Sequence, residues 1–234
     1  MRKLACILIV FSANFFLANF ALSQQPAGHE QHATRPAVSA DKIWSELMQG
    51  NQRFVSGKPH AQALVKQRDS LVNGQHPIAM VLSCSDSRVP PEMVFDQTLG
   101  DLFVVRAAGN IAGPLGLASL EYAYDHLGST VLVVLGHTKC GAVTAACSGE
   151  KMPTPNLQTM VDQIDPAVAK VKGSATGDAL IEAAIKENVH QSAMDIVAHS
   201  DVLQHAKAEG KLTIIEAEYQ LDTGKVVRLD KAHP

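Results

Sequence analysis

The sequence is poor in aromatic residues, in cysteine and in net charge. Aromatic side chains make up 5% of its 234 residues, there are four cysteines, and 20 basic residues nearly balance 23 acidic ones, for a formal net charge of −3. Four cysteines are too few for a disulfide scaffold, and a chain of this length can bury a core without one. No run of lysine or arginine indicates a nucleic-acid partner, so we expect none. Hydrophobic residues supply 46% of the chain, which is typical of a folded domain.

Residues 1–23 have the pattern of an export signal. Two basic residues precede an apolar stretch and a small-x-small cleavage site, Ala21-Leu22-Ser23. An uncleaved membrane anchor is the alternative, but the apolar stretch is near the lower length limit for a span and contains two asparagines. We therefore expect cleavage, a flexible lead-in over residues 24–39, and no membrane association afterwards. The expected location is outside the cytoplasm, in the periplasm.

Residues 40–234 alternate between apolar runs of strand length and helical patterns. The expected strands are residues 78–83, 102–106, 130–136, 212–217 and 225–229. The expected helices are residues 41–54, 113–127 and 178–209, the last of these broken near residue 200. Strands that are apolar on both faces and alternate with helices indicate a parallel sheet covered on two sides. We predict one α/β domain with a mostly parallel central sheet of four strands, a C-terminal edge strand, flanking helices and a helical N-terminal arm.

Cysteine and histidine residues directly follow two of the apolar strands. Cys84 comes after the first strand, and His137 and Cys140 come after the most apolar one. In open α/β sheets, sites form beyond the carboxyl ends of strands. Two thiolates and one imidazole suit Zn²⁺, and three protein ligands leave the fourth position that catalytic zinc sites keep open. Cys140 also begins a helix, whose free N–H groups favour a thiolate.

Asp86 and Arg88 lie just beyond Cys84. They are two residues apart, so in an extended segment their side chains lie on one side. Arg88 can hold the Asp86 carboxylate through a bidentate pair and keep it ionised. Near a metal, Asp86 could accept a hydrogen bond from water at the fourth position, or it could occupy that position itself.

Each of these features has a simpler interpretation when taken alone. A cysteine at a strand end is usually a small buried hydrophobic residue, and an Asp-x-Arg pair is usually a salt bridge within a loop. A Cys84–Cys140 disulfide competes with metal binding in an exported protein. Cys147 is expected to be a core residue rather than a ligand. The metal interpretation gains weight because the features occur together, each at the end of an apolar strand.

Two motifs resemble those of a known family, the β-class carbonic anhydrases. They are Cys84-Ser85-Asp86-Ser87-Arg88 and Gly136-His137-x-x-Cys140-Gly141, and the similarity continues from about Ile43 to Leu229. The resemblance implies an enzyme that hydrates carbon dioxide reversibly to bicarbonate and a proton. It also implies one zinc ion per subunit on Cys84, His137 and Cys140, with Asp86 and Arg88 as the catalytic dyad.

The resemblance further implies a substrate pocket and an oligomer. The substrate-binding residues would be Gln75, Phe103, Ala108, Tyr122 and Gly141. The family forms a homodimer or a higher even homo-oligomer, in which Gln75, Phe103 and Tyr122 would serve a neighbouring subunit's zinc. Gln75 matches the plant-type glutamine, and Val81 stands where the allosteric subgroup has tryptophan, which argues against shutdown by bicarbonate.

Three other functions remain open at this stage. The enzyme could hydrolyse a related cumulene, carbonyl sulfide or carbon disulfide, on the same fold. It could be a non-catalytic binding protein in which Asp86 permanently occupies the metal. A redox role through Cys140 and Cys147 is the most distant of the three.

Overall fold

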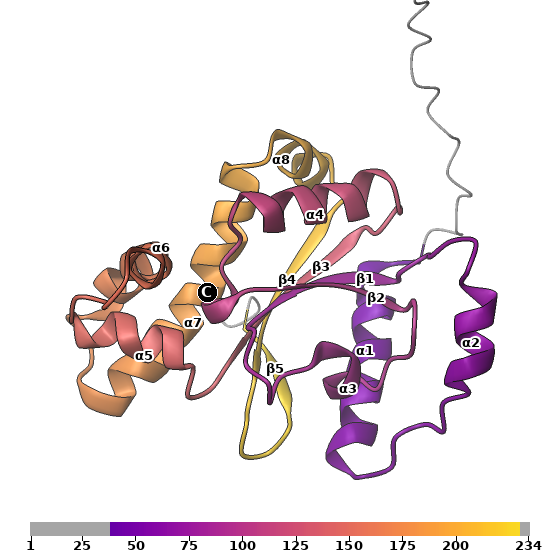
Figure 1. The fold of residues 1–234 in the computed structure, drawn as a ribbon, viewed down its shortest axis with the longest axis horizontal. Helices are drawn as coiled ribbons and strands as arrows, with labels where there is room; N and C mark the ends of the chain where they lie inside the picture. Colours follow the sequence, from indigo (N-terminus) through magenta and orange to yellow (C-terminus); the bar gives the residue numbers. More distant parts are fainter. Residues whose placement is uncertain (1–37, 230–234) are drawn as a thin grey trace, which may run out of the picture. The chain divides into compact units, whose positions relative to one another are not determined.

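The computed structural model describes residues 38–229. The predicted export signal and all but the last two residues of the predicted lead-in lie outside this range, so their assignment stays a prediction. The elements, drawn in Figure 1, are α1 (Ala40–Val55), α2 (Leu64–Ser70), β1 (Ala79–Ser83), α3 (Pro91–Val94), β2 (Leu102–Arg106), the 3₁₀ turn η1 (Ala108–Asn110), α4 (Pro114–Asp125), β3 (Val131–His137), α5 (Gly141–Ser148), α6 (Pro155–Val171), α7 (Gly177–Ala198), α8 (Asp201–Ala208), β4 (Thr213–Tyr219) and β5 (Val226–Arg228). Within residues 38–229, no helix combines the length and the apolar character needed to cross a bilayer.

The five strands form one sheet in the order β2-β1-β3-β4-β5. β1 to β4 run parallel, and β5 pairs antiparallel with β4, as the sequence predicted. Every residue of β1 and β3 is buried, because helices cover both faces of the central strands. The chain places β2 on one side of β1 and then β3 on the other. The winding therefore reverses between β1 and β3, and the carboxyl ends of these two strands flank the reversal.

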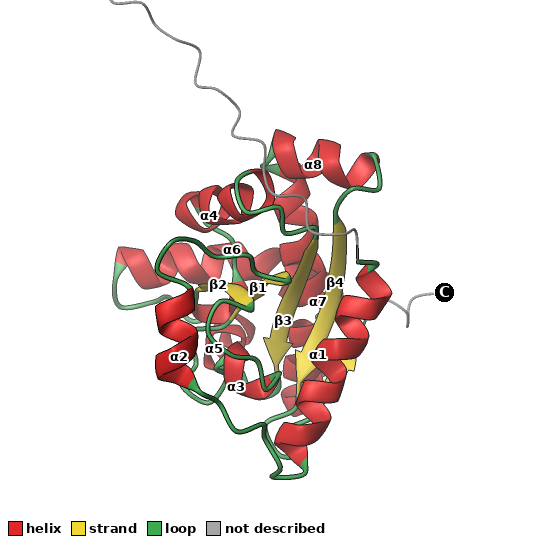
Figure 2. Cartoon of the chain, turned by 90° about the vertical axis from the view of Figure 1, so that its right-hand side faces the viewer, coloured by secondary structure: helices red, strands yellow, loops and turns green. Residues whose placement is uncertain are grey.

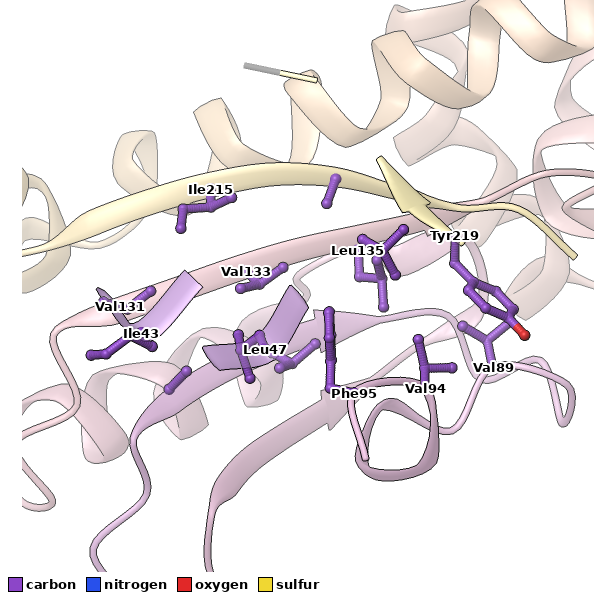
Figure 3. Close-up of a cluster of buried hydrophobic side chains, with 14 residues drawn as sticks. Ile43, Leu47, Val89, Val94, Phe95, Val131, Val133, Leu135, Ile215 and Tyr219 are labelled. Atoms are coloured by element: carbon purple, nitrogen blue, oxygen red, sulfur yellow. The ribbon is translucent and has the colours of Figure 1, made fainter. Parts of the chain in front are cut away.

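Helices pack on both faces of this sheet. On one face, Ile43 and Leu47 of α1 join the cluster formed by Val133 and Ile215 of the central strands, and Figure 2 shows α1 running alongside β4. Figure 3 shows these side chains pointing into a common apolar layer. On the other face, residues of α4, α7 and α8 pack against the alternate residues of β1 and β3. The alternation follows from the two-residue period of a strand.

The helices α5, α6 and α7 enclose a third apolar cluster at the edge of the sheet. Cys84 and Cys140 lie in it, beside Ile164 of α6 and Ile185 of α7. Helix α6 was not predicted from the sequence. Its start is nevertheless marked by Thr154, whose hydroxyl accepts a hydrogen bond from Leu157 N at 3.3 Å, with proline at the first helical position. The predicted break between α7 and α8 is confirmed, and Ser200 caps α8.

The buried side chain of Asn51 ties α1 to two distant segments. Its Nδ2 donates to the carbonyl oxygens of Val94 at 3.0 Å and Gly224 at 2.8 Å, and its Oδ1 accepts from Val226 N at 3.0 Å. All three bonds end on backbone groups, and those to Val94 and Val226 are buried. This residue therefore anchors the N-terminal helix to α3 and to the β4–β5 turn.

We expect Asn51→Leu to lower the free energy of unfolding by about 2–3 kcal/mol, because it leaves buried backbone donors and acceptors unpaired. Urea denaturation followed by circular dichroism measures the change. Gln52→Ala, at the exposed neighbouring position of the same helix, is the control and should shift stability by no more than about 0.5 kcal/mol. Equal effects of the two substitutions would contradict the anchoring role of Asn51.

Candidate metal centre

The side chains of Cys84, His137 and Cys140 converge at the carboxyl ends of β1 and β3. Cys84 follows β1, His137 is the last residue of β3, and Cys140 is the N-cap of α5. Their two sulfur atoms and one imidazole nitrogen all lie within 4.8 Å of one another, and all three residues are buried. Because β1 and β3 are neighbours in the sheet, residues more than fifty positions apart in the chain meet at one point.

A tight turn brings His137 and Cys140 to the same point. Lys139 adopts the left-handed conformation, with φ of 57°, which reverses the chain between the two ligands. Thr138 fixes this turn against β4, since its N–H donates to Tyr219 O and its hydroxyl accepts from Leu221 N, both at 3.0 Å. The two ligands are therefore held by the sheet itself.

The hydrogen bonding of His137 selects the nitrogen that can bind a metal. His137 Nδ1 lies 2.9 Å from Thr138 O, and a carbonyl oxygen can only accept, so Nδ1 carries the proton. Nε2 is then left with its lone pair. It is buried and has no hydrogen-bond partner within residues 38–229. A buried nitrogen lone pair without a partner beside two sulfur atoms fits a metal ligand.

Cys84 and Cys140 are free thiols, and each affects the pKa of the other. Hydrogen bonding from the Cys140 thiol lowers the pKa of Cys84 against the opposing effect of burial. The same hydrogen bond to Cys84, together with burial, raises the pKa of Cys140. The two shifts run in opposite directions, so Cys84 is the thiol of the pair that ionises more readily. Two sulfur ligands and one imidazole are a donor set that suits zinc, so the residues present fit that ion.

Asp86 and Arg88 form the bidentate pair that their spacing predicts. Arg88 Nε donates to Asp86 Oδ1 at 2.9 Å, and Arg88 Nη2 donates to Oδ2 at 2.7 Å. These bonds hold the pKa of Asp86 well below its usual range. Asp86 Oδ2 also lies 3.9 Å from His137 Nε2, and the Asp86 side chain is 18% exposed while that of Arg88 is 55% exposed. The carboxylate therefore stands between solvent and the buried cluster.

Arg106 supports this segment, and the sequence analysis assigned it no role. Its Nε donates to Cys84 O at 2.9 Å and its Nη2 donates to Asp86 O at 2.5 Å. Arg106 is the last residue of β2 and pairs with Ser83 in the register of the sheet. A basic residue at the end of a strand is visible in the sequence, but its neighbour is known only once the strand order is known.

Two of the predicted substrate-binding residues adjoin the cluster. Ala108 is half-buried in η1, next to Gly109, whose N–H donates to Cys84 Sγ at 3.4 Å. Gly141 follows Cys140 directly and is exposed at the start of α5. Both therefore lie where a small molecule could approach the ligands.

The other three predicted substrate-binding residues lie elsewhere in this chain. The rings of Phe103 and Tyr122 contact each other, with centroids 6.2 Å apart. Phe103 pairs with Met80 in the sheet, and Cys84 is four residues further along, about 13 Å at the usual rise of a strand. Gln75 is exposed in the segment before β1. Within residues 38–229, Phe103 packs in the apolar cluster formed with α4, α7 and α8 rather than in the one that contains Cys84 and Cys140.

Comparison with known proteins gives one family. Residues 79–226 match the family described as carbonic anhydrase. Carbonic anhydrase 2 of Mycobacterium tuberculosis is 38% identical over 199 residues, covering 83% of this chain and 95% of that protein. The solved structure of the β-carbonic anhydrase CcaA superposes with a TM-score of 0.65 at 28% identity, covering 81% of this chain and 96% of that one. A tetrameric β-carbonic anhydrase of Sordaria macrospora shares the fold, with a TM-score of 0.64 at 22% identity over 80% of this chain and 97% of that one.

We expect Cys84→Ser and His137→Ala to reduce bound zinc from about one equivalent per chain to nearly none, because two remaining ligands cannot complete the site. Elemental analysis of the purified proteins measures the metal. Cys147→Ser is the matched control, since Cys147 lies on α5 outside the cluster, and should retain zinc. Full zinc content in either ligand variant would remove that residue from the ligand set.

Proposed function

The chain belongs to the β-class carbonic anhydrase family, and on that premise we propose that it binds one zinc ion on Cys84, His137 and Cys140 and hydrates carbon dioxide reversibly to bicarbonate and a proton. The family assignment makes it an enzyme of the lyase class. The observation that supports the finer proposal is the convergence of three ligand atoms within 4.8 Å. An ionised carboxylate beside them adds to this support.

Asp86 would orient the reacting water. When bound, zinc supplies the Lewis acidity that brings the pKa of water towards neutrality. An ionised carboxylate can only accept hydrogen bonds. Asp86 Oδ2 would therefore accept a hydrogen bond from that water and orient the water's lone pair towards the carbon of the substrate. Arg88 holds both carboxylate oxygens, which keeps Asp86 ionised and fixed in one orientation.

The substrate is small and apolar, and the surroundings of the cluster suit it. Ala108 and Gly141 offer a surface without charge next to the ligands. The amide of Gln75 would donate a hydrogen bond to one oxygen of carbon dioxide. The ring of Phe103 would cover the apolar side of the substrate pocket. The product is an anion, and water would displace it as the proton passes to the solvent.

A second copy of the chain would supply Gln75, Phe103 and Tyr122 to the metal site. β2 forms an edge of the sheet with its side chains half-buried, and Tyr122 is 47% exposed on the covering helix α4. A structural neighbour is described as tetrameric. We therefore place Gln75, Phe103 and Tyr122 at the neighbouring subunit's site in a homodimer or a higher even homo-oligomer.

Two further parts of the proposal rest on the sequence alone. Residues 1–23 would direct export to the periplasm and be removed there. The alternative substrate is a related cumulene, carbonyl sulfide or carbon disulfide, because the same ligands could serve both reactions. Stopped-flow rates measured on carbon dioxide and on carbonyl sulfide with one enzyme preparation decide between the two substrates.

We expect Asp86→Ala to keep zinc and to lose carbon dioxide hydration by about 100-fold, because the reacting water is no longer oriented. Stopped-flow hydration and elemental analysis on the same sample measure both quantities. Asp69→Ala is the control, since Asp69 forms an exposed pair with Arg68 at 2.6 Å, and it should be fully active. Wild-type activity in Asp86→Ala would remove the carboxylate from the mechanism. A wild-type protein that holds zinc but is inactive at every pH would refute the proposed hydration of carbon dioxide.

Mixing two defective chains tests the shared site. Gln75→Ala alone should lose about tenfold in kcat/KM, the value of one hydrogen bond, and Cys84→Ser alone should be inactive. In a mixed dimer, the intact zinc ligands of the Gln75→Ala chain would meet Gln75 of the Cys84→Ser chain. We therefore expect one site per mixed dimer to recover wild-type kcat/KM. Absence of recovery in purified mixed dimers would place Gln75 at its own subunit's site.

A further inference from the structure

A buried hydrogen bond links α7 to the peptide group beside Cys84. Asn188 Nδ2 donates to Gly109 O at 2.7 Å, across 79 positions in the chain. Its orientation is fixed by chemistry, since a carbonyl oxygen accepts only from the amide nitrogen. The other amide atom, Asn188 Oδ1, is buried and has no hydrogen-bond partner within residues 38–229. The buried Asn188 side chain therefore contributes the hydrogen bond that it donates to Gly109 O, while its oxygen has no partner within the described residues.

Gly109 is the residue through which that bond can act on the metal centre. Its N–H donates to Cys84 Sγ at 3.4 Å, while its C=O accepts from Asn188. Gly109 has φ of 72°, and a Cβ placed there would meet Ile164 Cδ1 at 2.7 Å. Glycine is therefore required at this position, but glycine is also the residue whose backbone rotates most freely. The N–H and the C=O of Gly109 belong to successive peptide groups, so a bond that fixes the C=O restricts rotation of the Gly109 backbone and with it the direction of the N–H that faces the sulfur.

We propose that Asn188 is a positioning residue for the metal centre, which holds the backbone of Gly109 through its C=O so that the N–H of the same residue donates to the Cys84 sulfur. This inference rests on the proposed zinc site. The N–H stabilises negative charge on the sulfur in both the metal-free and the metal-bound protein. Groups that orient and polarise metal ligands in this way typically contribute 10-fold to 100-fold to metal affinity.

The same helix offers a matched control one turn further on. Ser192 Oγ accepts from Asn110 Nδ2 at 3.4 Å, so Ser192 also joins α7 to η1. Asn188 and Ser192 are both buried. The two contacts differ in that only the one from Asn188 reaches Gly109. Ser192→Ala therefore reports the effect of loosening α7 from η1 without touching the residue that donates to Cys84.

The test measures metal affinity and the electronic state of the sulfur in the full chain. Zinc affinity is measured by competition with a chelator, and the thiolate-to-metal charge-transfer bands are recorded after loading with Co²⁺. We expect Asn188→Leu to weaken zinc binding about 10-fold to 100-fold and to shift the charge-transfer bands, because the sulfur has lost its hydrogen bond. Ser192→Ala should leave both the bands and the affinity close to wild type.

The outcomes separate this inference from the proposed function. Wild-type affinity in Asn188→Leu, equal weakening in both variants, or weakening without a shift of the bands would overturn the inference and leave the zinc site standing. A wild-type protein without measurable zinc affinity would overturn both. If Asn188→Leu does not fold, Asn188→Ala removes the same donor with a smaller side chain and no new charge, and the same shift of the bands is expected.

Discussion

The close approach of two sulfur atoms and one imidazole nitrogen in an apolar interior is the constraint on which the rest of the structure depends. The three atoms lie within 4.8 Å of one another, and Cys84 and Cys140 are surrounded by residues such as Ile164 and Ile185. Groups that carry or share charge are costly to bury unless they are paired, hydrogen-bonded or bound to a metal. The fold meets this requirement with backbone N–H groups, a fixed imidazole tautomer and a donor set that fits zinc.

The topology of the sheet decides where this cluster can form. β1 and β3 are adjacent and parallel, and β2 lies on the far side of β1. The carboxyl ends of β1 and β3 therefore lie side by side at the same end of the sheet. Helix α5 begins there, with Cys140 at its cap. The strands fix the positions of the ligands, while the loops that follow the strands bring the carboxylate and the first helical turn to them.

Residues from four separate segments of the chain hold the ligands and the carboxylate in place. Arg88 fixes Asp86, Arg106 at the end of β2 holds the carbonyl groups of Cys84 and Asp86, and Thr138 selects the nitrogen of His137. Asn188 of α7 reaches Cys84 through Gly109. Each of these bonds is made by a side chain or carbonyl group that does not itself bind the metal. Such an outer layer is what gives a metal centre a fixed geometry.

The sequence alone determined the parallel sheet, its edge strand and the metal-ligand candidates, because apolar runs of strand length and the residues that follow them are local patterns. Helix α6 was missed although its capping threonine and proline are also local. Only the tertiary structure decided that Arg106 bonds to the carbonyl groups of Cys84 and Asp86, that Asn188 bonds to Gly109, and that Phe103 contacts Tyr122. These relations depend on strand order, on the register of β1 with β2 and on the packing of α7 against η1. Such contacts join residues far apart in the chain, and no short pattern encodes which of them meet.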